Sequence, residues 1–116
     1  AGPHLEARYT EATGRTLSLT EIAAIAATDT QAEAVITHLC DWFARCVASV
    51  INILDPDIVV LGGGVSNVDA LYSRGVESLS KWVFNDVPHT RIVRNQLGDS
   101  AGVFGAAMLT AQDGSA

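Results

Sequence analysis

The chain has 116 residues, of which 48% are hydrophobic and 17% are charged, a composition typical of one folded domain with a modest core. Thirteen acidic residues against seven basic ones give a formal net charge of −6. This balance argues against a nucleic-acid groove or a binding face for anionic membranes, because both need positive charge.

Two short helices are predicted near the amino terminus. The first spans about residues 3–13, with Pro3 in its first turn and Gly14 at its end. The second opens at Ser18, because Ser18 and Glu21 have the spacing of a capping box, in which each side chain bonds the backbone amide of the other residue.

A long third helix is predicted from Asp29 or Thr30, either of which can cap it, to about Leu54. Its polar residues recur every four positions along one stripe: Glu33, Thr37, Asp41, Arg45 and Ser49. Such a narrow polar stripe predicts a helix that is buried on most sides. Within the stripe, Asp41 and Arg45 have the spacing of a favourable i, i+4 ion pair.

The two cysteines, Cys40 and Cys46, lie on this helix about 120° apart around its axis, so they cannot pair with each other. No Cys or His cluster has the spacing of a metal site. We expect two buried free thiols in a reducing, cytoplasmic compartment. The apolar run after residue 47 is cut by Asp55-Pro56-Asp57, which argues against a membrane span, and the opening AGPHLEARY lacks the pattern of a signal peptide.

The hydrophobic period changes in the second half of the chain. Residues 58–61 are all aliphatic, which is typical of a strand covered on both faces in a parallel sheet. Three glycines follow, and then an amphipathic helix over about residues 67–83. Its apolar face consists of Val68, Leu71, Tyr72, Val76, Leu79 and Val83. A second strand is predicted over residues 90–95.

A last helix is predicted after Asp99 or Ser100, either of which can cap it. One face of that helix has small residues that allow close packing on a sheet: Gly102, Gly105 and Ala106. The fold class is therefore α/β, with residues 1–54 helical and residues 55–116 a strand, glycine turn, helix, strand and helix in a βαβα order. Two parallel strands do not form an independent sheet, so this single unit, residues 1–116, looks like part of a larger lobe.

The turn Gly62-Gly63-Gly64, with Val65 after it, is the candidate ligand site. It lies at the carboxyl end of a parallel strand, where open α/β sheets bind ligands, and glycine lets a ligand approach the backbone closely. Amides of the turn and of the following helix are suited to a ribose or a phosphate. A tight turn without a ligand is an equal alternative, because the sequence has neither a dinucleotide fingerprint nor a P-loop.

Other polar residues are interpreted as structural. Asp55 and Asp57 lie at the wrong end of the strand and are interpreted as a helix stop and a strand start, and Asp99 as a helix cap rather than a metal ligand. The histidines have no nucleophile or carboxylate beside them that predicts catalysis: His4, His38 and His89. Three aromatic residues are predicted to lie in the core: Trp42, Phe43 and Trp82.

The string INILDPDIVVLGGGVSNVDALY, followed by GDSAGVFGAAML, resembles the carboxy-terminal part of the ROK family of sugar kinases and repressors. The NILDPD run, the GGGVSNVD turn, the KWVF stretch and the GDSAG…GAA ending are most similar to bacterial fructokinases, also called manno(fructo)kinases. The opening AGPHLEARY resembles the stretch after the family's Cys-rich zinc motif, with Ala1 where a Ser is usual. The resemblance covers essentially the whole chain.

This resemblance implies part of a ribonuclease-H-like, actin-like ATPase lobe, two of which close around ATP and a hexose, with fructose as the expected sugar. The turn of Gly62, Gly63 and Gly64 would lie against the adenosine side of ATP, with Mg²⁺ on the phosphates and an Asp as base. The family's phosphate loop, catalytic Asp, sugar-contacting residues and zinc ligands match nothing here, so we expect them upstream and expect zinc only in an intact protein. The hypothesis is a carboxy-terminal segment, without a starting Met, that is inactive alone.

Several alternatives remain open from the sequence. An N-acetylglucosamine kinase or glucokinase of the same family would share these strings, and so would a ROK transcriptional repressor, which an amino-terminal helix-turn-helix would distinguish. A non-catalytic module that pairs with a second chain is a further alternative. We expect a homo-oligomer, or association with the amino-terminal part, because an uncovered sheet edge and apolar surface favour self-association. ROK kinases also resemble one another in forming dimers.

Overall fold

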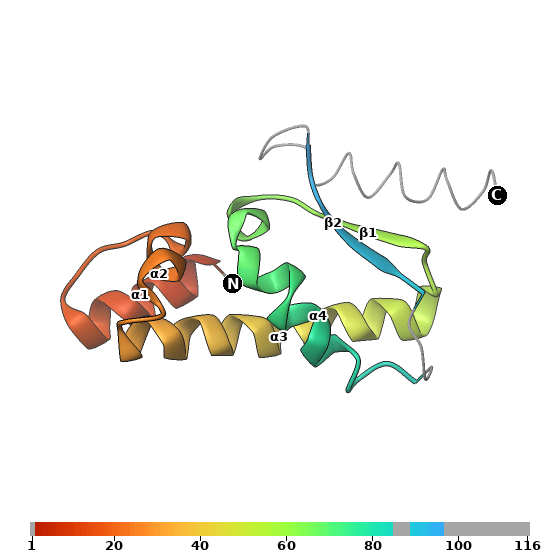
Figure 1. The fold of residues 1–116 in the computed structure, drawn as a ribbon, viewed down its shortest axis with the longest axis horizontal. Coiled ribbons are helices and arrows are strands. Elements are labelled where there is room, and N and C mark those ends of the chain that lie inside the picture. Colours follow the sequence, from red (N-terminus) through yellow and green to blue (C-terminus); the bar gives the residue numbers. More distant parts are fainter. Residues whose placement is uncertain (1, 85–88, 97–116) are drawn as a thin grey trace.

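The computed structural model describes residues 2–84 and 89–96. Its elements follow in the order α1 (Gly2–Thr13), α2 (Leu19–Ile25), α3 (Thr30–Leu54), β1 (Ile58–Leu61), η1 (Gly64–Asn67), η2 (Asp69–Tyr72), α4 (Arg74–Leu79) and β2 (Arg91–Arg94). Figure 1 shows α3 as a rod along the molecule, with α1 and α2 against its first half and the two strands crossing above its second half. The helical first half and the parallel strands of the predicted α/β class are thus present. The helix predicted after Asp99 lies outside the described residues.

The helix boundaries predicted for the first half are confirmed. Gly14 follows α1 with φ +77°, and Ser18 and Glu21 form both bonds of the capping box at the start of α2. Asp29 caps α3, because its Oδ1 accepts hydrogen bonds from the amides of Gln31 and Ala32 at 2.9 and 3.0 Å. These local signals depend on only a few neighbouring residues, which is why the sequence reveals them.

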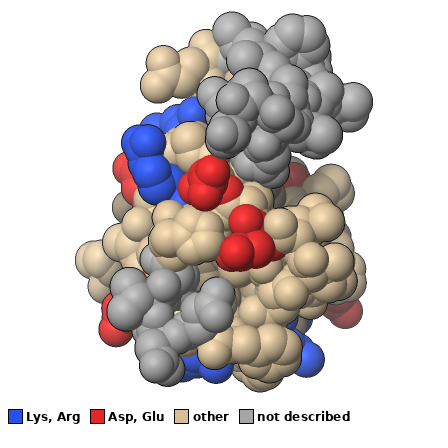
Figure 2. Space-filling view, turned by 90° about the vertical axis from the view of Figure 1, so that its right-hand side faces the viewer, with Lys and Arg blue, Asp and Glu red and all other residues tan. Residues whose placement is uncertain are grey.

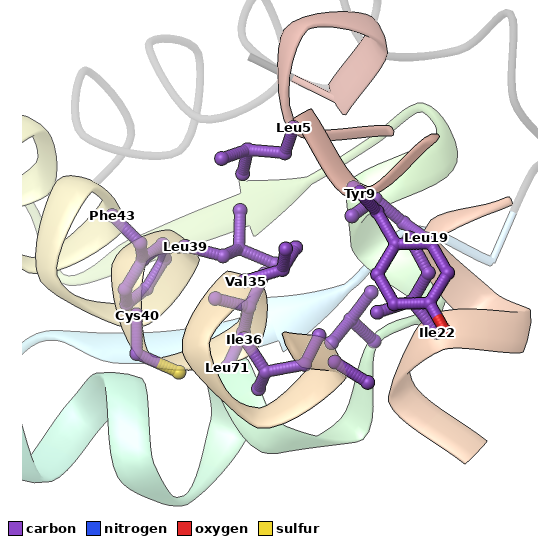
Figure 3. Close-up of a cluster of buried hydrophobic side chains, with 12 residues drawn as sticks. Leu5, Tyr9, Leu19, Ile22, Val35, Ile36, Leu39, Cys40, Phe43 and Leu71 are labelled. Atoms are coloured by element: carbon purple, nitrogen blue, oxygen red, sulfur yellow. The ribbon is translucent and has the colours of Figure 1, made fainter. Parts of the chain in front are cut away.

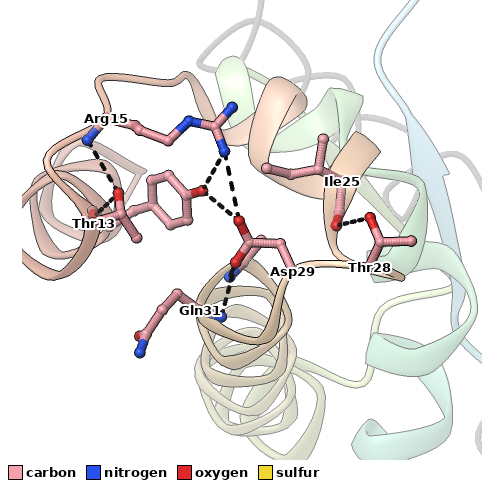
Figure 4. Close-up of polar contacts among 8 residues, drawn as sticks. Thr13, Arg15, Ile25, Thr28, Asp29 and Gln31 are labelled. Carbon is pink, nitrogen blue, oxygen red and sulfur yellow. Dashed lines mark hydrogen bonds and ion pairs between the residues drawn. The ribbon is translucent and has the colours of Figure 1, made fainter.

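The N-cap of α3 is also a tertiary contact (Figure 4). The Tyr9 hydroxyl in α1 donates a 2.8 Å hydrogen bond to Asp29 Oδ2, and Arg15 Nη1 lies 3.7 Å from the same oxygen. The hydrogen bond from the Ala32 amide, and then that from Tyr9, lower the pKa of Asp29. Burial is the main cause of the raised pKa of Tyr9. One carboxylate therefore starts α3 and holds α1 beside it.

Helix α3 packs with one face only, among the described residues. Its buried residues recur at three- and four-residue spacing: Ala32, Val35, Ile36, Leu39, Cys40, Phe43, Ala44, Ala48 and Ile51. The prediction of a helix buried on most sides is therefore wrong for this part of the chain, since Trp42 and Val50 are each 41% exposed on the far side. The prediction of two buried thiols holds for Cys40 and is wrong for Cys46, which is exposed.

Helix α3 is long and apolar enough to cross a membrane, with a mean hydropathy of 1.4 over its most apolar 18-residue window. Core helices of soluble proteins pass the same test, and 44% of that window is buried within the chain. The predicted Asp41–Arg45 pair is present on the exposed side, at 3.8 Å. The helix ends at Asp55, whose backbone is left-handed with φ +47° and whose amide bonds the carbonyl of Ile51 at 2.8 Å.

The segment predicted as one helix over residues 67–83 is broken in the structure. Two 3₁₀ turns, η1 and η2, precede the six-residue α4, because Val68 between the turns has extended φ and ψ angles of −91° and 105°. Val68, which precedes η2, and Leu71 within it are still buried. Val76 is 37% exposed, so the predicted apolar face is only partly correct.

Two clusters of buried side chains form the core. The larger one joins α1, α2, α3 and the turns after β1 (Figure 3): Leu5, Tyr9, Leu19, Ile22, Ala32, Val35, Ile36, Leu39, Cys40, Phe43, Val68 and Leu71. The smaller one joins α3 to α4: Ala44, Ala48, Ile51, Leu79 and Val83. Of the aromatic residues predicted in the core, Phe43 is buried, whereas Trp42 and Trp82 are 41% and 46% exposed. Trp82 instead lies under the guanidinium of Arg45, 5.5 Å from its ring centre.

The two strands are parallel, with Ile58 opposite Arg91 and Leu61 opposite Arg94. This pairing confirms the second predicted strand. All four residues of β1 are only half-buried within the described part of the chain, so the prediction that both faces are covered is not met there. The pairing places the carboxyl ends of β1 and β2 side by side, and this edge carries the glycine turn.

Candidate functional site

A hollow of about 400 Å³ opens at the carboxyl end of β1. Three segments and Asn67, the last residue of η1, line it: Gly2, Pro3 and Glu6 from α1; Ser18, Leu19 and Thr20 at the start of α2; and Gly62, Gly63, Gly64 and Val65. The structure therefore brings all four predicted site residues into one hollow. The contributions of α1 and α2 were not predicted, because they depend on how the helices pack and not on any motif.

The glycines shape the floor of this hollow. Gly63 has φ +74° and ψ −169°, a combination that is essentially restricted to glycine. A Cβ added to Gly63 or Gly64 would meet no atom of residues 2–84 or 89–96 within 4 Å. The space above the turn is therefore open, and at Gly64 no neighbour among the described residues requires a glycine. An open approach to bare backbone is what a ligand site at a strand end needs.

Ser66, immediately after the turn, connects it to the rest of the fold. Its amide and its hydroxyl both donate to the carbonyl oxygen of Gly63, at 3.1 and 2.6 Å. Its own carbonyl oxygen accepts hydrogen bonds from the Tyr72 hydroxyl at 2.6 Å and from Arg94 Nε at 2.8 Å. Ser66 is only 4% exposed, so the bonds lie in a largely water-excluded position. The turn is thus held from behind by side chains that do not enter the hollow.

Arg94, the last residue of β2, makes two further contacts. Its Nη2 donates to Asp69 Oδ1, and its guanidinium lies 4.9 Å from the centre of the Tyr72 ring. The hydrogen bond to Asp69, followed by that to Tyr72, raises the pKa of Arg94. Sequence analysis missed Ser66, Tyr72 and Arg94. The available signal was that Arg94 lies next to the carboxyl end of the strand predicted over residues 90–95, which in a parallel pair is the end that carries the glycine turn.

The opposite wall of the hollow is held by two carboxylates. Glu6 accepts a 2.8 Å hydrogen bond from the amide of Leu19, which ties α1 to the start of α2. Glu21 accepts a 2.9 Å hydrogen bond from the amide of Ser18, and that bond is the main cause of the lowered pKa of Glu21. A Cβ at Gly2 would lie 3.4 Å from Leu19 Cδ1 and 3.9 Å from Val65 Cγ1, so α1 begins close to both walls.

The charge of the lining restricts what the hollow can hold. No Lys, Arg or His belongs to it among the described residues, and its one charged side chain is the acidic Glu6. Such a lining is poorly suited to a group of phosphates, which need cations or a bound metal ion. It offers instead backbone groups, the hydroxyls of Ser18 and Thr20, the amide of Asn67 and apolar surface. This chemistry fits an uncharged polar ligand portion, such as a base and its ribose.

The remaining candidate residues lie elsewhere. Asp55 and Asp57 precede β1, at the end away from the hollow, and each lies 3.4 Å from Nε2 of His89. His38 lines a separate surface depression with Cys46, and His4 is exposed on α1. Across residues 2–84 and 89–96, no group of three or more His, Cys, Asp or Glu side chains is placed to hold a metal ion.

The arrangement of the helices and the parallel strand pair is similar to part of solved sugar kinases with the actin-like ATPase fold. The crystal structure of the ROK hexokinase from Thermus thermophilus is similar with a TM-score of 0.70 and 30% identity, over 94% of this chain and 38% of that one. A putative sugar kinase from Cytophaga hutchinsonii shares the fold, with a TM-score of 0.66 over 94% of this chain and 41% of that one, at 24% identity. The sequence model of the ROK family matches residues 1–113, and the chain belongs to this family.

Several of the curated proteins that are similar to this chain are N-acetyl-D-glucosamine kinases. That of Escherichia coli O1:K1 is 38% identical over 85 residues, 73% of this chain and 28% of its own length. That of Photobacterium profundum is 35% identical over 111 residues, 94% of this chain and 36% of its own length. The chain thus spans about a third of these relatives' length. The family is confirmed, whereas the narrower resemblance to fructokinases is not supported by these relatives.

Proposed function

We propose that this chain forms the nucleoside-binding wall of an ATP-dependent hexose kinase, which transfers the γ-phosphoryl group of ATP to a sugar hydroxyl. One observation carries this proposal: the open hollow over Gly62, Gly63, Gly64 and Val65 at the end of a parallel strand. Its lining of backbone groups, hydroxyls and apolar surface, without a cationic side chain among the described residues, supports a base and ribose. Membership of a family that contains sugar kinases supports the reaction class.

The proposal gives this chain a binding role and no catalytic one. In phosphoryl transfer the protein's work is to position the nucleotide and the acceptor, while Mg²⁺ stabilises charge on the phosphates and an Asp takes the hydroxyl proton. Among the described residues, the hollow has no cluster of acidic side chains that could bind Mg²⁺. We therefore expect the phosphates and their Mg²⁺ to lie outside the hollow. We assign neither the base nor any zinc ligand to residues of this chain.

The sugar is proposed at two levels. A hexose is supported by membership of the family and by the name of the similar Thermus thermophilus structure. Between hexoses, the strings of residues 51–72 and 98–109 favour fructose by resemblance, while the names of the curated relatives favour N-acetyl-D-glucosamine. Because two-thirds of the relatives' length has no counterpart here, we place the choice of sugar outside this chain.

Release of ADP by the intact protein tests the proposal, with Mg²⁺ and ATP and with fructose or N-acetyl-D-glucosamine as acceptor. We expect sugar-dependent release with at least one hexose, and measurable binding of ATP without sugar. The proposal would be wrong if the folded protein bound no ATP. If sugar did not increase ADP release, and if the protein slowed the migration of DNA in a gel, the repressor alternative would be favoured instead.

We further propose a cytoplasmic protein that binds no nucleic acid and associates with itself or with the remaining part of a kinase. Three apolar side chains are strongly exposed among the described residues: Ile53 at 79%, Leu54 at 69% and Phe84 at 88%. Figure 2 shows one end of the molecule, where Lys and Arg lie beside acidic side chains and form no continuous basic surface. Light scattering of the intact protein tests self-association, and a monomer would contradict it.

A further inference from the structure

We propose that Arg94 is a positioning residue for the nucleotide: from behind the hollow, it fixes the glycine turn in the shape that binds the nucleoside. This inference rests on the proposed function and adds a residue to it. Arg94 is not part of the lining of the hollow, so it would act through the backbone of Ser66 and not by touching the ligand.

The contacts form a short chain from β2 to the turn. Arg94 Nε donates to the carbonyl oxygen of Ser66 at 2.8 Å, and the Ser66 hydroxyl and amide donate to the carbonyl oxygen of Gly63 at 2.6 and 3.1 Å. The peptide plane that follows Gly63 is therefore held through one intermediate residue. Gly63 is the residue whose backbone angles place the floor of the hollow.

The turn has no equivalent support from the ligand side. The Cβ directions of Gly63 and Gly64 point into open space, with no atom of the described residues within 4 Å. Glycine is also the residue with the most backbone freedom to lose on ordering. To present a fixed surface, the three glycines therefore depend on hydrogen bonds on the side of the turn away from the hollow. Two of these bonds, from the Tyr72 hydroxyl and from Arg94 Nε, go to the carbonyl oxygen of Ser66.

An arginine is needed for this geometry. Its planar fork bonds Ser66 through Nε and Asp69 through Nη2 at the same time, while its face stacks 4.9 Å from the Tyr72 ring. A lysine ammonium at this position cannot bond both partners and stack. The contact with Asp69 is itself weak support, because that carboxylate is 91% exposed, so the bond to the buried Ser66 is the one that matters.

The test compares Arg94→Met with Arg91→Met in the intact protein. Arg91 is an exposed residue of the same strand, and its side chain makes no hydrogen bond or ion pair within the described part of the chain. The dissociation constant for ATP and the KM values for ATP and sugar are measured well below the lowest Tm of the set. Arg94→Met should weaken ATP binding about tenfold, with the KM for sugar within about twofold of its original value, and Arg91→Met should change neither.

Two more variants keep the inference open to refutation if Arg94→Met does not fold. Tyr72→Phe removes only the second donor to the Ser66 carbonyl oxygen, and we expect about threefold weaker ATP binding. Arg94→Lys should restore binding in part. If the folded variants had a lower Tm but an unchanged affinity for ATP, the role of Arg94 would be merely structural. That result would overturn this inference and leave the proposed function standing. If the unaltered protein bound no ATP, the proposed function would fail first and this inference with it.

Discussion

Gly75 of α4 lies so close to Phe43 of α3 that a Cβ at this position would be 2.9 Å from Phe43 Cδ2 and 3.1 Å from Cε2. The two helices therefore meet through a glycine on one side and an aromatic ring on the other. Phe43 is 3% exposed and belongs to the larger core cluster, so the ring has little room to move away.

Gly75→Ala is expected to lower the free energy of unfolding by about 1–3 kcal/mol, because the added methyl group must displace the ring or push α4 outward. Chemical denaturation of the intact protein measures this change. Ser80→Ala is the matched control, since Ser80 lies just beyond the same helix and is exposed, and its hydroxyl bonds only the nearby carbonyl of Glu77 among the described residues. Equal stability of Gly75→Ala and the unaltered protein would contradict the contact.

Gly63 and Gly64, both in the turn that lines the hollow, should respond differently to the same change. Gly63→Ala should cost about 1–3 kcal/mol of stability, because φ +74° with ψ −169° is strained for any residue with a Cβ. Gly64→Ala should leave stability within about 0.5 kcal/mol, since the added Cβ has no atom within 4 Å in the part of the chain that the structure describes. Under the proposed function, Gly64→Ala should nevertheless weaken ATP binding, because the methyl group projects into the space the nucleoside would use. Calorimetry of ATP binding, together with thermal unfolding, separates the effect on binding from the effect on stability. A Gly64→Ala protein that binds ATP normally would contradict the proposal that the nucleoside lies in the hollow.

The sequence predicts well where a few neighbouring residues decide the structure. The capping box of Ser18 and Glu21 and the N-cap at Asp29 are such cases, as is the left-handed helix stop at Asp55. It fails where packing decides: the apolar period after residue 67 fits one helix, yet Val68 is extended and divides the segment, while Val68 and Leu71 still belong to the core. The exposed Trp42 fits the same rule, because helical spacing marks a face without saying what covers it.

The candidate site shows the same division. The glycine turn was predicted from its place after a strand, and the structure opens a hollow there. Its opposite wall comes from residues about sixty and forty positions earlier, such as Pro3 and Thr20. No local sequence pattern predicts that these residues lie beside the glycine turn. Arg94 was overlooked because an arginine at a strand end has no motif, although the parallel pairing with Leu61 places it at the turn.

Asp29 should make the stability depend on pH. Its pKa in the folded protein is lowered, so its stabilising contribution is complete above its unfolded pKa near 4 and is lost as the pH falls through the lower folded value. Asp29→Ala removes the helix cap and the acceptor of the Tyr9 hydroxyl, and it should lower the Tm by about 5 °C at pH 7. At acid pH the gap to the unaltered protein should narrow. Asp41→Ala, on the exposed side of the same helix, should change the Tm little, and an equal loss in both variants would contradict the cap.

The two cysteines should differ sharply in reactivity. Cys40 is 3% exposed, its Sγ lies 3.8 Å from the carbonyl oxygen of Ala70, and burial raises the pKa of its thiol, so both access and thiolate formation are restricted. Cys46 is exposed on the other side of α3. A thiol reagent such as Ellman's reagent should therefore modify Cys46 quickly in the native protein and Cys40 only after unfolding. Peptide mass mapping assigns the modified residue, and Cys46→Ser should remove the fast reaction of the two cysteines. Fast modification of Cys40 in the native protein would contradict the burial of the face of α3 that carries Cys40.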